Sequence, residues 1–353
     1  MREPGKILVT GGCGFIGSNF VRHMLETYKG LQVVNLDALT YAGRLENLED
    51  VKDDPRYRFI HGNICDPKAV EEAVRGVDAV VHFAAESHVD RSIEHPAVFV
   101  ETNVAGTQVL LDAAMKSKPE IFVQISTDEV YGSLGPEGYF TENTPLAPNS
   151  PYSASKAGAD MLALAYHHTF GLPVAVTRCS NNYGPYQFPE KLIPLFINNA
   201  MRDIPVPLYG DGLNVRDWLH VLDHCRAIDL VMRRGRLGEA YNIGGNNEKK
   251  NIEITKLILG KLGKPESLIS YVQDRLGHDR RYAIDSARIQ AELGWRPLYD
   301  FDSGMDQTIK WYQENQDWCM AVSGQFKGRY SLPARAGCSV PTSWRAFQAS
   351  TRS

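Results

Sequence analysis

The sequence predicts an α/β protein built on a doubly wound parallel sheet of the Rossmann type, followed by a smaller mixed α/β lobe. Short apolar segments alternate with amphipathic helical stretches through the first half of the chain. The apolar segments are almost continuously hydrophobic, as parallel strands are when helices cover both faces of their sheet. A glycine-rich turn separates the first strand from the first helix. The six predicted strands are residues 6–10, 32–36, 57–61, 79–83, 121–125 and 174–178.

The glycine-rich turn is the first candidate binding element. Residues 11–17 read Gly-Gly-Cys-Gly-Phe-Ile-Gly, and such a turn lets backbone N–H groups approach a diphosphate at the N-terminus of a helix. This spacing alone is a weak signal, because a plain turn is a strong alternative. Asp37 ends the second strand, 20 residues after Gly17, where a carboxylate accepts a hydrogen bond from an adenosine ribose and repels a 2′-phosphate. No Arg follows at residues 38–40, so the sequence favours NAD over NADP.

Two groups of reactive side chains follow the fifth predicted strand. That strand runs into Ser-Thr-Asp-Glu at residues 126–129, at the sheet edge where parallel α/β proteins place their chemistry. After an insertion rich in Gly and Pro at residues 132–148, Tyr152 and Lys156 open a helix. Their i, i+4 spacing places them on one helix face. We therefore expect a phenol, an ammonium group, two carboxyls and a hydroxyl to converge on one point.

The βα alternation stops after the sixth strand, and this change predicts the domain organisation. We expect residues 1–178 to form the dinucleotide-binding domain, returning in part through later segments, and residues 179–320 to form mainly the second lobe. Helices near residues 223–234, 254–262, 286–293 and 305–315 are expected to support that lobe. Residues 321–353 are rich in Ser, Arg, Gly and Ala and lack periodicity, which predicts a tail of uncertain order.

Composition narrows the class of partner. The 353 residues are 43% hydrophobic and carry a net charge of −4, which gives no reason to expect nucleic acid or an anionic membrane surface. The six cysteines lack the spacing of a metal site or a disulfide framework, so we expect reduced thiols and no metal. No signal peptide or long apolar segment is visible, which predicts a cytoplasmic protein.

Five longer segments narrow the interpretation further. They are Ala-Ala-Glu-Ser-His-Val-Asp-Arg-Ser at residues 84–92, Ser-Thr-Asp-Glu-Val-Tyr-Gly at 126–132, Asn-Asn-Tyr-Gly-Pro-Tyr at 181–186, Pro-Glu-Lys-Leu-Ile-Pro at 189–194 and Gly-His-Asp-Arg-Arg-Tyr-Ala-Ile-Asp at 277–285. Together with the glycine turn and Tyr-x-x-x-Lys, residues 5–320 resemble the extended short-chain dehydrogenase/reductases and, within them, the dTDP-glucose 4,6-dehydratases. The resemblance implies NAD as cofactor, dTDP-glucose as substrate, dTDP-4-keto-6-deoxyglucose and water as products, and a homodimer.

The resemblance also implies a set of binding residues. Those for NAD are Gly11, Gly14, Phe15, Ile16, Gly17, Asp37, Ala38, Leu39, Thr40, Asn63, Ile64, Phe83, Ala84, Ala85, Ser87, Thr102, Tyr152, Lys156 and Asn182. Those for the nucleotide sugar are Ser87, Thr127, Asn181, Lys191, Leu192, Pro207, Leu208, Tyr209, Arg216, Asn251, Asp274, Arg275 and His278. Three positions depart from the family pattern, which usually has Ala at Cys13, Asp at Asn63 and Pro at Leu276; the second leaves the adenine contact open.

Each catalytic residue has an expected role in the implied reaction. Tyr152, as a phenolate, takes the 4-OH proton while C4 is oxidised. Lys156 and the nicotinamide charge are expected to lower its pKa from near 10. Glu129 then removes the C5 proton and Asp128, as a neutral acid, protonates the departing C6 hydroxyl, while Thr127 holds O4. Arg216 is the candidate for binding the diphosphate.

Three alternatives stay open. A UDP-sugar 4-epimerase or decarboxylase would keep the fold and the Tyr152–Lys156 pair but needs no acid–base pair beside C5 and C6. Another nucleoside-diphosphate-hexose 4,6-dehydratase would share the fold and the chemistry, and these residues do not determine the choice between thymine and uracil. A non-catalytic NAD-binding regulator is a remote third, because it needs neither the pair nor the carboxyls.

Overall fold

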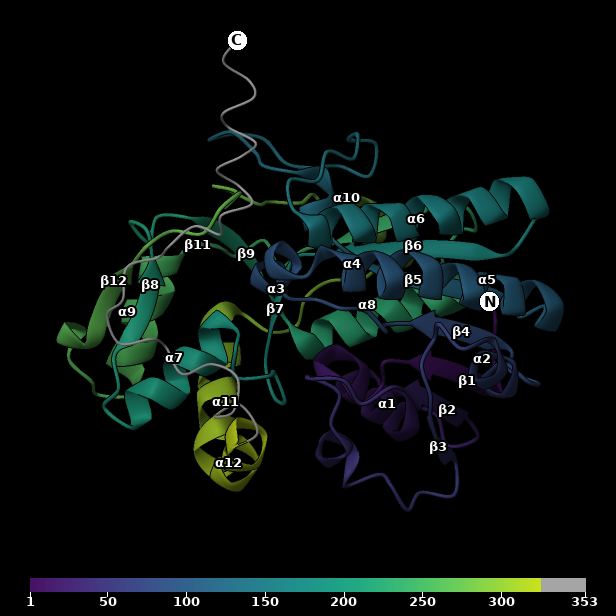
Figure 1. Cartoon of the computed structure of the whole chain (residues 1–353), viewed down its shortest axis with the longest axis horizontal. Coiled ribbons are helices and arrows are strands. Elements are labelled where there is room, and N and C mark those ends of the chain that lie inside the picture. Colours follow the sequence, from purple (N-terminus) through teal and green to yellow (C-terminus); the bar gives the residue numbers. More distant parts are fainter. Residues whose placement is uncertain (325–353) are drawn as a thin grey trace, which may run out of the picture.

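The computed structural model describes residues 1–324 and contains a seven-stranded sheet in the order β10-β6-β5-β4-β1-β2-β3 (Figure 1). Every neighbouring pair of strands is parallel, so the predicted doubly wound α/β fold is confirmed. The order reverses between β1 and β4, which opens a crevice at the carboxyl ends of these strands. The strands are β1 (Lys6–Thr10), β2 (Gln32–Asp37), β3 (Tyr57–His61), β4 (Ala79–His82), β5 (Ile121–Thr127), β6 (Val174–Cys179) and β10 (Ala240–Ile243). The edge strand β10 was not predicted.

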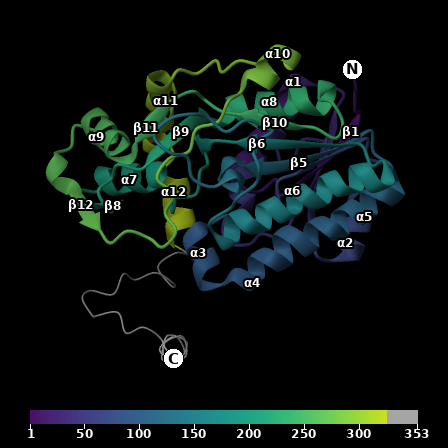
Figure 2. The ribbon, with the colours of Figure 1, turned by 90° about the horizontal axis from the view of Figure 1, so that it is seen from above.

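Helices cover both faces of this sheet, and each face has its own apolar core (Figure 2). One face is covered by α1 (Phe15–Thr27), α8 (Val221–Arg234) and α10 (Ala287–Leu293). The other is covered by α2 (Pro67–Ala73), α5 (Thr107–Ser117) and α6 (Pro151–Phe170). The single helix expected at residues 96–118 is a continuous helical run in three parts, α4 (Pro96–Phe99), the π-helical η2 (Val100–Gly106) and α5. Shorter helices are α3 (Val89–Glu94) and the 3-10 segments η1 (Leu45–Leu48) and η3 (Asp128–Tyr131).

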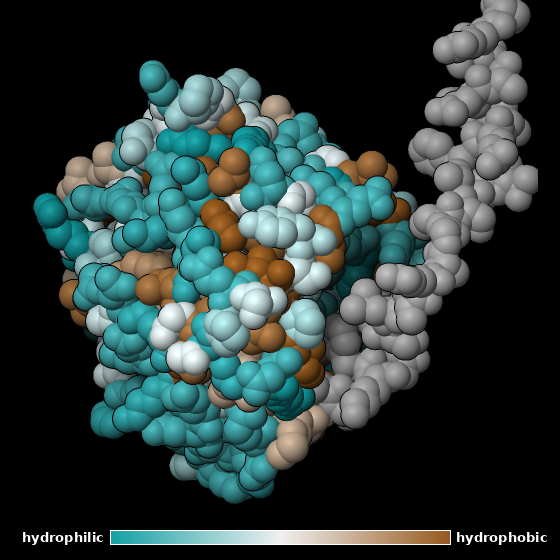
Figure 3. Space-filling view, turned by 90° about the vertical axis from the view of Figure 1, so that its left-hand side faces the viewer, coloured by the Kyte–Doolittle hydropathy of each residue, from teal (hydrophilic) through white to brown (hydrophobic). Residues whose placement is uncertain are grey.

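The smaller lobe packs beside the carboxyl edge of the main sheet. It contains two small sheets, β11-β9-β7 and β12-β8, with a third core formed mainly by apolar side chains of its helices. Its elements are β7 (Asn181–Tyr183), α7 (Leu192–Met201), β8 (Val206–Tyr209), β9 (Val215–His220), β11 (Glu248–Lys250), α9 (Asn251–Lys261), η4 (Glu266–Leu268), β12 (Ile269–Val272), α11 (Phe301–Glu314) and α12 (Gln316–Gly324). Figure 3 shows this side of the molecule as mostly hydrophilic, with a group of apolar side chains near the middle.

Two expectations about the second half of the chain were wrong in part. Of the four helices assigned to the smaller lobe, α9 and α11 belong to it, but α8 and α10 pack on the main sheet. Cys225, Ile228 and Val231 on α8 share a core with strands of that sheet, because the chain returns to it after β9. Residues 321–324 end helix α12 rather than starting a tail, and Val322 is buried. The rest of the predicted tail, residues 325–353, lies outside the described residues.

Two kinds of feature are absent from residues 1–324. None of the helices in this part of the chain combines the length and apolar character that crossing a bilayer would need. No cluster of three or more His, Cys, Asp or Glu side chains is placed there to bind a metal ion.

Candidate active site

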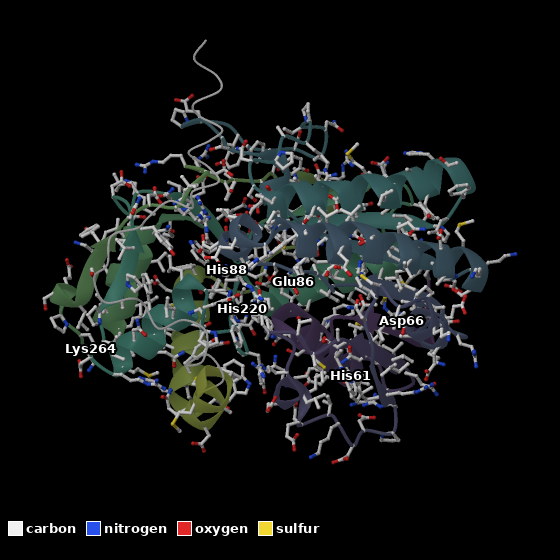
Figure 4. The ribbon with its side chains drawn as sticks, viewed as in Figure 1. His61, Asp66, Glu86, His88, His220 and Lys264 are labelled. Carbon is white, nitrogen blue, oxygen red and sulfur yellow. The ribbon has the colours of Figure 1, made fainter. Side chains whose placement is uncertain are left out.

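Two adjoining cavities lie at the carboxyl edge of the main sheet. The cavity over the sheet has a volume of about 320 Å³, and the one extending under the smaller lobe has a volume of about 650 Å³. We call them the sheet cavity and the lobe cavity. Figure 4 shows Glu86, His88 and His220 in the middle of the molecule, between the two lobes. Seven residues line both cavities, and so mark where they meet: Ser87, Glu129, Asn181, Asn182, Gln187, Glu190 and Lys191.

The glycine-rich turn forms one wall of the sheet cavity and is shaped for close backbone approach. Gly11 has φ +71°, and a Cβ atom there would lie 2.6 Å from the Ala84 nitrogen. A Cβ atom on Gly17 would lie 2.3 Å from the Gly11 carbonyl oxygen. Helix α1 then begins with Gly14 as N-cap and no side chain capping its first N–H groups. Uncapped N–H groups at a helix N-terminus suit an anion such as the diphosphate of a dinucleotide, so this wall fits such a group.

Asp37 supports the same turn. Its carboxylate oxygens accept hydrogen bonds from the backbone N–H groups of Cys13 (2.9 Å) and Leu39 (2.8 Å). Burial raises the pKa of Asp37, while these two bonds and nearby His61 oppose that rise. A carboxylate oxygen accepts more than one hydrogen bond, so Asp37 can support the turn and still accept the expected hydrogen bond from a ribose.

Tyr152 and Lys156 lie on the first turns of α6, which is firmly capped. Ser150 and Ser153 form a capping box and Pro151 occupies the first helical position, so the start of this helix is fixed. The Lys156 ammonium donates to the Ile125 carbonyl oxygen at 2.6 Å. The side chains of Tyr152 and Lys156 both line the sheet cavity.

The surroundings of Tyr152 act on the pKa of its phenol. Burial raises it well above 10, and Glu129, Cys179, Asp128 and Tyr41 raise it further. The Lys156 ammonium donates to the Ile125 carbonyl oxygen. The lowering of the Tyr152 pKa by Lys156 together with the positive charge of the nicotinamide stays a prediction.

The carboxyls of Asp128 and Glu129 face the same cavity from η3, at the end of β5. Burial raises the pKa of Asp128 well above its ordinary value, and the charges of Glu129 and Asp217 add to the rise. Burial also raises the pKa of Glu129, but Arg275, Arg216 and Lys191 oppose it. Asp128 Oδ1 accepts a hydrogen bond from the Thr127 hydroxyl (3.2 Å), whereas Oδ2 has no hydrogen-bond partner among the residues that the structure describes. These environments favour a protonated Asp128 beside an ionised Glu129.

Cationic side chains gather in the lobe cavity. Arg216 is 5% exposed, and its guanidinium donates to the Val215 and Asp279 carbonyl oxygens. Within the described part of the chain it forms no ion pair with a carboxylate, and burial lowers its pKa. A buried guanidinium with only carbonyl partners is expected to gain from binding an anion. Lys191 and Arg275 line the same cavity, so the site suits a diphosphate.

Most predicted binding residues line one of the two cavities. For the cofactor set, all but Leu39 line the sheet cavity; Leu39 has φ +50° and packs against the core. For the substrate set, Thr127 lines the sheet cavity and all others but Asp274 line the lobe cavity. Asp274 is 44% exposed at its side chain, and its carboxylate accepts a hydrogen bond from His278 Nδ1 at 2.6 Å, so it holds a lining residue in place.

The three positions that depart from the family pattern, Cys13, Asn63 and Leu276, lie in different surroundings. The Asn63 amide oxygen accepts from the Cys65 N–H (2.9 Å) beside the sheet cavity, and the adenine contact stays a prediction. Cys13 is buried, and burial with the charge of Asp37 raises its thiol pKa to about 12. Leu276 is 77% exposed and lines neither cavity.

Sequence reasoning missed several lining residues. Tyr41 lines the sheet cavity, with the Arg91 guanidinium 3.7 Å from its ring centroid and the Phe188 ring edge-on at 5.8 Å. Glu190 lines both cavities, and Tyr282 lies in the lobe cavity with Arg216 stacked 4.3 Å from its ring centroid. Tyr41 follows Thr40 directly, and Glu190 and Tyr282 lie within the segments 189–194 and 277–285 already singled out, which was the available signal.

Comparison with known proteins gives a consistent result. The sequence model of the family described as GDP-mannose 4,6 dehydratase matches residues 8–308. The dTDP-glucose 4,6-dehydratase of Xanthomonas campestris pv. campestris (strain B100) is 53% identical over 353 aligned residues, which cover 94% of this chain and 99% of the relative. The protein of the same name from Streptomyces griseus is 57% identical, over 88% of this chain and 95% of the relative.

Solved structures agree with these matches. The dTDP-glucose 4,6-dehydratase of Streptomyces venezuelae, crystallised with NAD bound, superposes with a TM-score of 0.88 at 54% identity, covering 90% of this chain and 99% of that one. The UDP-glucose 4-epimerase of Thermus thermophilus, also in complex with NAD, has a TM-score of 0.81 at 31% identity, over 88% and 99%. The epimerase shares the fold at much lower identity. The chain therefore belongs to the dTDP-glucose 4,6-dehydratase family of the extended short-chain dehydrogenase/reductases.

Proposed function

We propose that the protein is an NAD-dependent carbon–oxygen hydro-lyase that converts dTDP-glucose to dTDP-4-keto-6-deoxyglucose and water. One observation carries the proposal: Tyr152, Lys156, Asp128 and Glu129 line the same cavity. A phenol–ammonium pair would suffice for the proton transfer of C4 oxidation, with bound NAD as the hydride acceptor. The adjoining acid and base are what an elimination across C5 and C6 needs in addition. The names of the relatives support the same substrate.

When bound, NAD supplies the hydride acceptor for C4 and the hydride donor for C6, so no net oxidant is consumed. The turn between Gly11 and Gly17 would hold its diphosphate, and Asp37 its adenosine ribose. Lys156 would hold the nicotinamide ribose, exchanging its bond to Ile125 for one to the ligand.

The residues of the chain move protons in a closed cycle. Tyr152 as phenolate accepts the 4-OH proton, and the C4 carbonyl makes the C5 proton acidic. Glu129 accepts the C5 proton, the C6–O bond breaks, and Asp128 gives its proton to the departing hydroxyl to form water. Glu129 then returns its proton to C5. One proton remains on Tyr152 and one is missing from Asp128, so a transfer between them restores the starting state.

The lobe cavity would bind the nucleoside diphosphate. Arg216 and Lys191 would contact the phosphate oxygens; what supports this is that both are cations that line this cavity. Asn251 presents a buried amide oxygen that has no hydrogen-bond partner in the described part of the chain, so it is available to a ligand donor.

The test is incubation with dTDP-glucose and with UDP-glucose side by side, with the products identified by mass. We expect loss of one water from dTDP-glucose. Tyr152→Phe is the control, because it removes the base for the first step. A product of unchanged mass from both sugars would replace the proposal with an epimerase. NAD released by heating without any turnover would favour the non-catalytic regulator.

The 4-epimerase is the second candidate, because a solved UDP-glucose 4-epimerase shares this fold. The buried Asp128–Glu129 pair argues for elimination. We further propose a homodimer in the cytoplasm, as the resemblance implies, and sedimentation of the purified protein tests the dimer.

A further inference from the structure

A third polar side chain on α6 lies outside both cavities. Tyr152, Lys156 and Asp160 follow one another at four-residue intervals, so they share one helix face. Asp160 Oδ2 accepts a hydrogen bond from Arg178 Nε on β6 at 3.0 Å, and the two side chains are 0% and 4% exposed. Because desolvation offsets most of the attraction, such a pair adds little net stability. Separating its members nevertheless leaves an uncompensated buried charge, so the pair fixes α6 against β6.

Arg178 makes a second buried contact, with the other half of the site. Its Nη1 donates to the Tyr131 hydroxyl at 2.8 Å, and that hydroxyl donates to Asn242 Oδ1 on β10 at 2.8 Å. The Tyr131 ring is stacked on Phe140 with centroids 5.0 Å apart. Tyr131 is the last residue of η3, the short turn that begins at Asp128. One guanidinium therefore joins the helix of the phenol–ammonium pair to the turn of the two carboxyls.

We propose that Asp160, Arg178 and Tyr131 form a positioning link that holds the oxidising group of the site in register with its eliminating group. The link rests on the proposed function, since it matters only if both steps occur at one bound sugar. Both steps act on neighbouring carbons, so a small displacement of η3 relative to α6 takes the carboxyls away from C5 and C6 while leaving Tyr152 at C4. Displacements of about 1 Å cost rate factors of about 100 in positioned reactions.

The matched test is Tyr131→Phe, which keeps the stacked ring and removes only the hydroxyl between Arg178 and Asn242. We expect C4 oxidation to stay within about threefold of the wild type and water loss to fall about 10- to 100-fold. Reduced nicotinamide then accumulates, seen as absorbance at 340 nm. Uptake of solvent deuterium at C5 slows. Thermal unfolding of the protein and its bound NAD content are measured in parallel. Neither is expected to change enough to explain the altered ratio of C4 oxidation to water loss.

Two further variants complete the design. Tyr241→Phe is the control, because Tyr241 is a fully buried residue whose hydroxyl donates to Glu292 away from the site; its ratio of oxidation to water loss should equal that of the wild type. Arg178→Lys serves if Tyr131→Phe does not fold, since Lys keeps the cation beside Asp160 but lacks the fork that reaches a second acceptor. It should show the same shift.

The outcomes separate the two proposals. A normal ratio in Tyr131→Phe, or an equal loss of both steps, overturns the positioning link while the reaction itself stands. If the wild-type protein loses no water from dTDP-glucose, the proposed function fails first.

Discussion

Replacing Asp128 by asparagine tests the assignment of the general acid. The substitution keeps the shape and the Thr127 contact, because an amide oxygen accepts the same hydroxyl. The amide nitrogen replaces Oδ2, which has no hydrogen-bond partner among residues 1–324, so no bond within this part of the chain is lost. What is lost is a transferable proton. General acid catalysis contributes about 10²–10⁴ in rate, or about 3–5 kcal/mol of barrier, so water loss should fall by that factor while C4 oxidation persists.

The same change should make the protein more stable at neutral pH. The folded state raises the pKa of Asp128, so it binds this proton more tightly than the unfolded chain does. The contribution of Asp128 to the free energy of unfolding is therefore fully present below the ordinary carboxyl pKa, and it is lost as pH rises through the folded-state pKa. Asparagine does not titrate and escapes that loss. We expect a higher Tm than the wild type at pH 8, with the difference shrinking towards pH 4.

Asp217→Asn is the contrasting variant, because Asp217 is equally buried but fully engaged. Its carboxylate accepts from the Gly245 and Asn247 N–H groups at 2.9 and 2.7 Å. The amide of the new asparagine would replace one of these acceptors with a donor, so we expect Asp217→Asn to lower the free energy of unfolding by about 1–3 kcal/mol. Scanning fluorimetry from pH 4 to 8 and product analysis by mass measure both variants. Water loss within threefold of the wild type in Asp128→Asn would refute the general-acid role, and a lowered Tm would refute the neutral buried acid.

Three further predictions follow from the site. Glu129→Gln should retain C4 oxidation but lose about 10²–10⁴ in C5 deuterium uptake, and uptake at the wild-type rate would remove Glu129 as the base. Arg216→Lys should raise the KM for dTDP-glucose about tenfold with little change in kcat, because a point charge replaces a bidentate one; an unchanged KM would exclude a phosphate contact. Trp318 donates to Asn47, which donates to the Cys13 carbonyl oxygen in the glycine turn. Trp318→Phe should therefore accelerate NAD dissociation, measured by fluorescence. Identical dissociation rates in the variant and the wild type would exclude this support of the turn.

The sheet was predictable because its signal is local. Strands such as β1 and β4 are apolar on both faces, and that pattern by itself reports helices above and below. Strand β10 gave no such signal: it has four residues, Ala-Tyr-Asn-Ile, and joins the sheet through its pairing with β6, far away in sequence. Helix α8 was assigned to the wrong lobe for a related reason, since an amphipathic pattern reports that one face is buried but not against what.

The site divides in the same way. The spacing of Tyr152 and Lys156 fixed their shared helix face, and their place at the cavity follows from the helix that they open. The lowering of the Tyr152 pKa was assigned to Lys156 together with the nicotinamide, and that stays a prediction. The sequence could not show that the Lys156 ammonium also donates to the Ile125 carbonyl oxygen, because that partner lies 31 residues away. Arg178 looked like an ordinary strand residue, because its two partners lie 18 and 47 residues away along the chain.

What the sequence determined by itself was the kind of chemistry available: a glycine turn for a diphosphate, a phenol with an ammonium four residues on, and two adjacent carboxyls. Residue type and short spacing carry that information, because backbone geometry converts it directly into a shared turn or helix face. Only the tertiary structure showed that burial raises the pKa of Asp128 well above its ordinary value, and that Arg216 has carbonyl partners but no carboxylate partner within residues 1–324. Both depend on burial and on charges brought together from distant segments, and the free energy of a charge is set by everything around it.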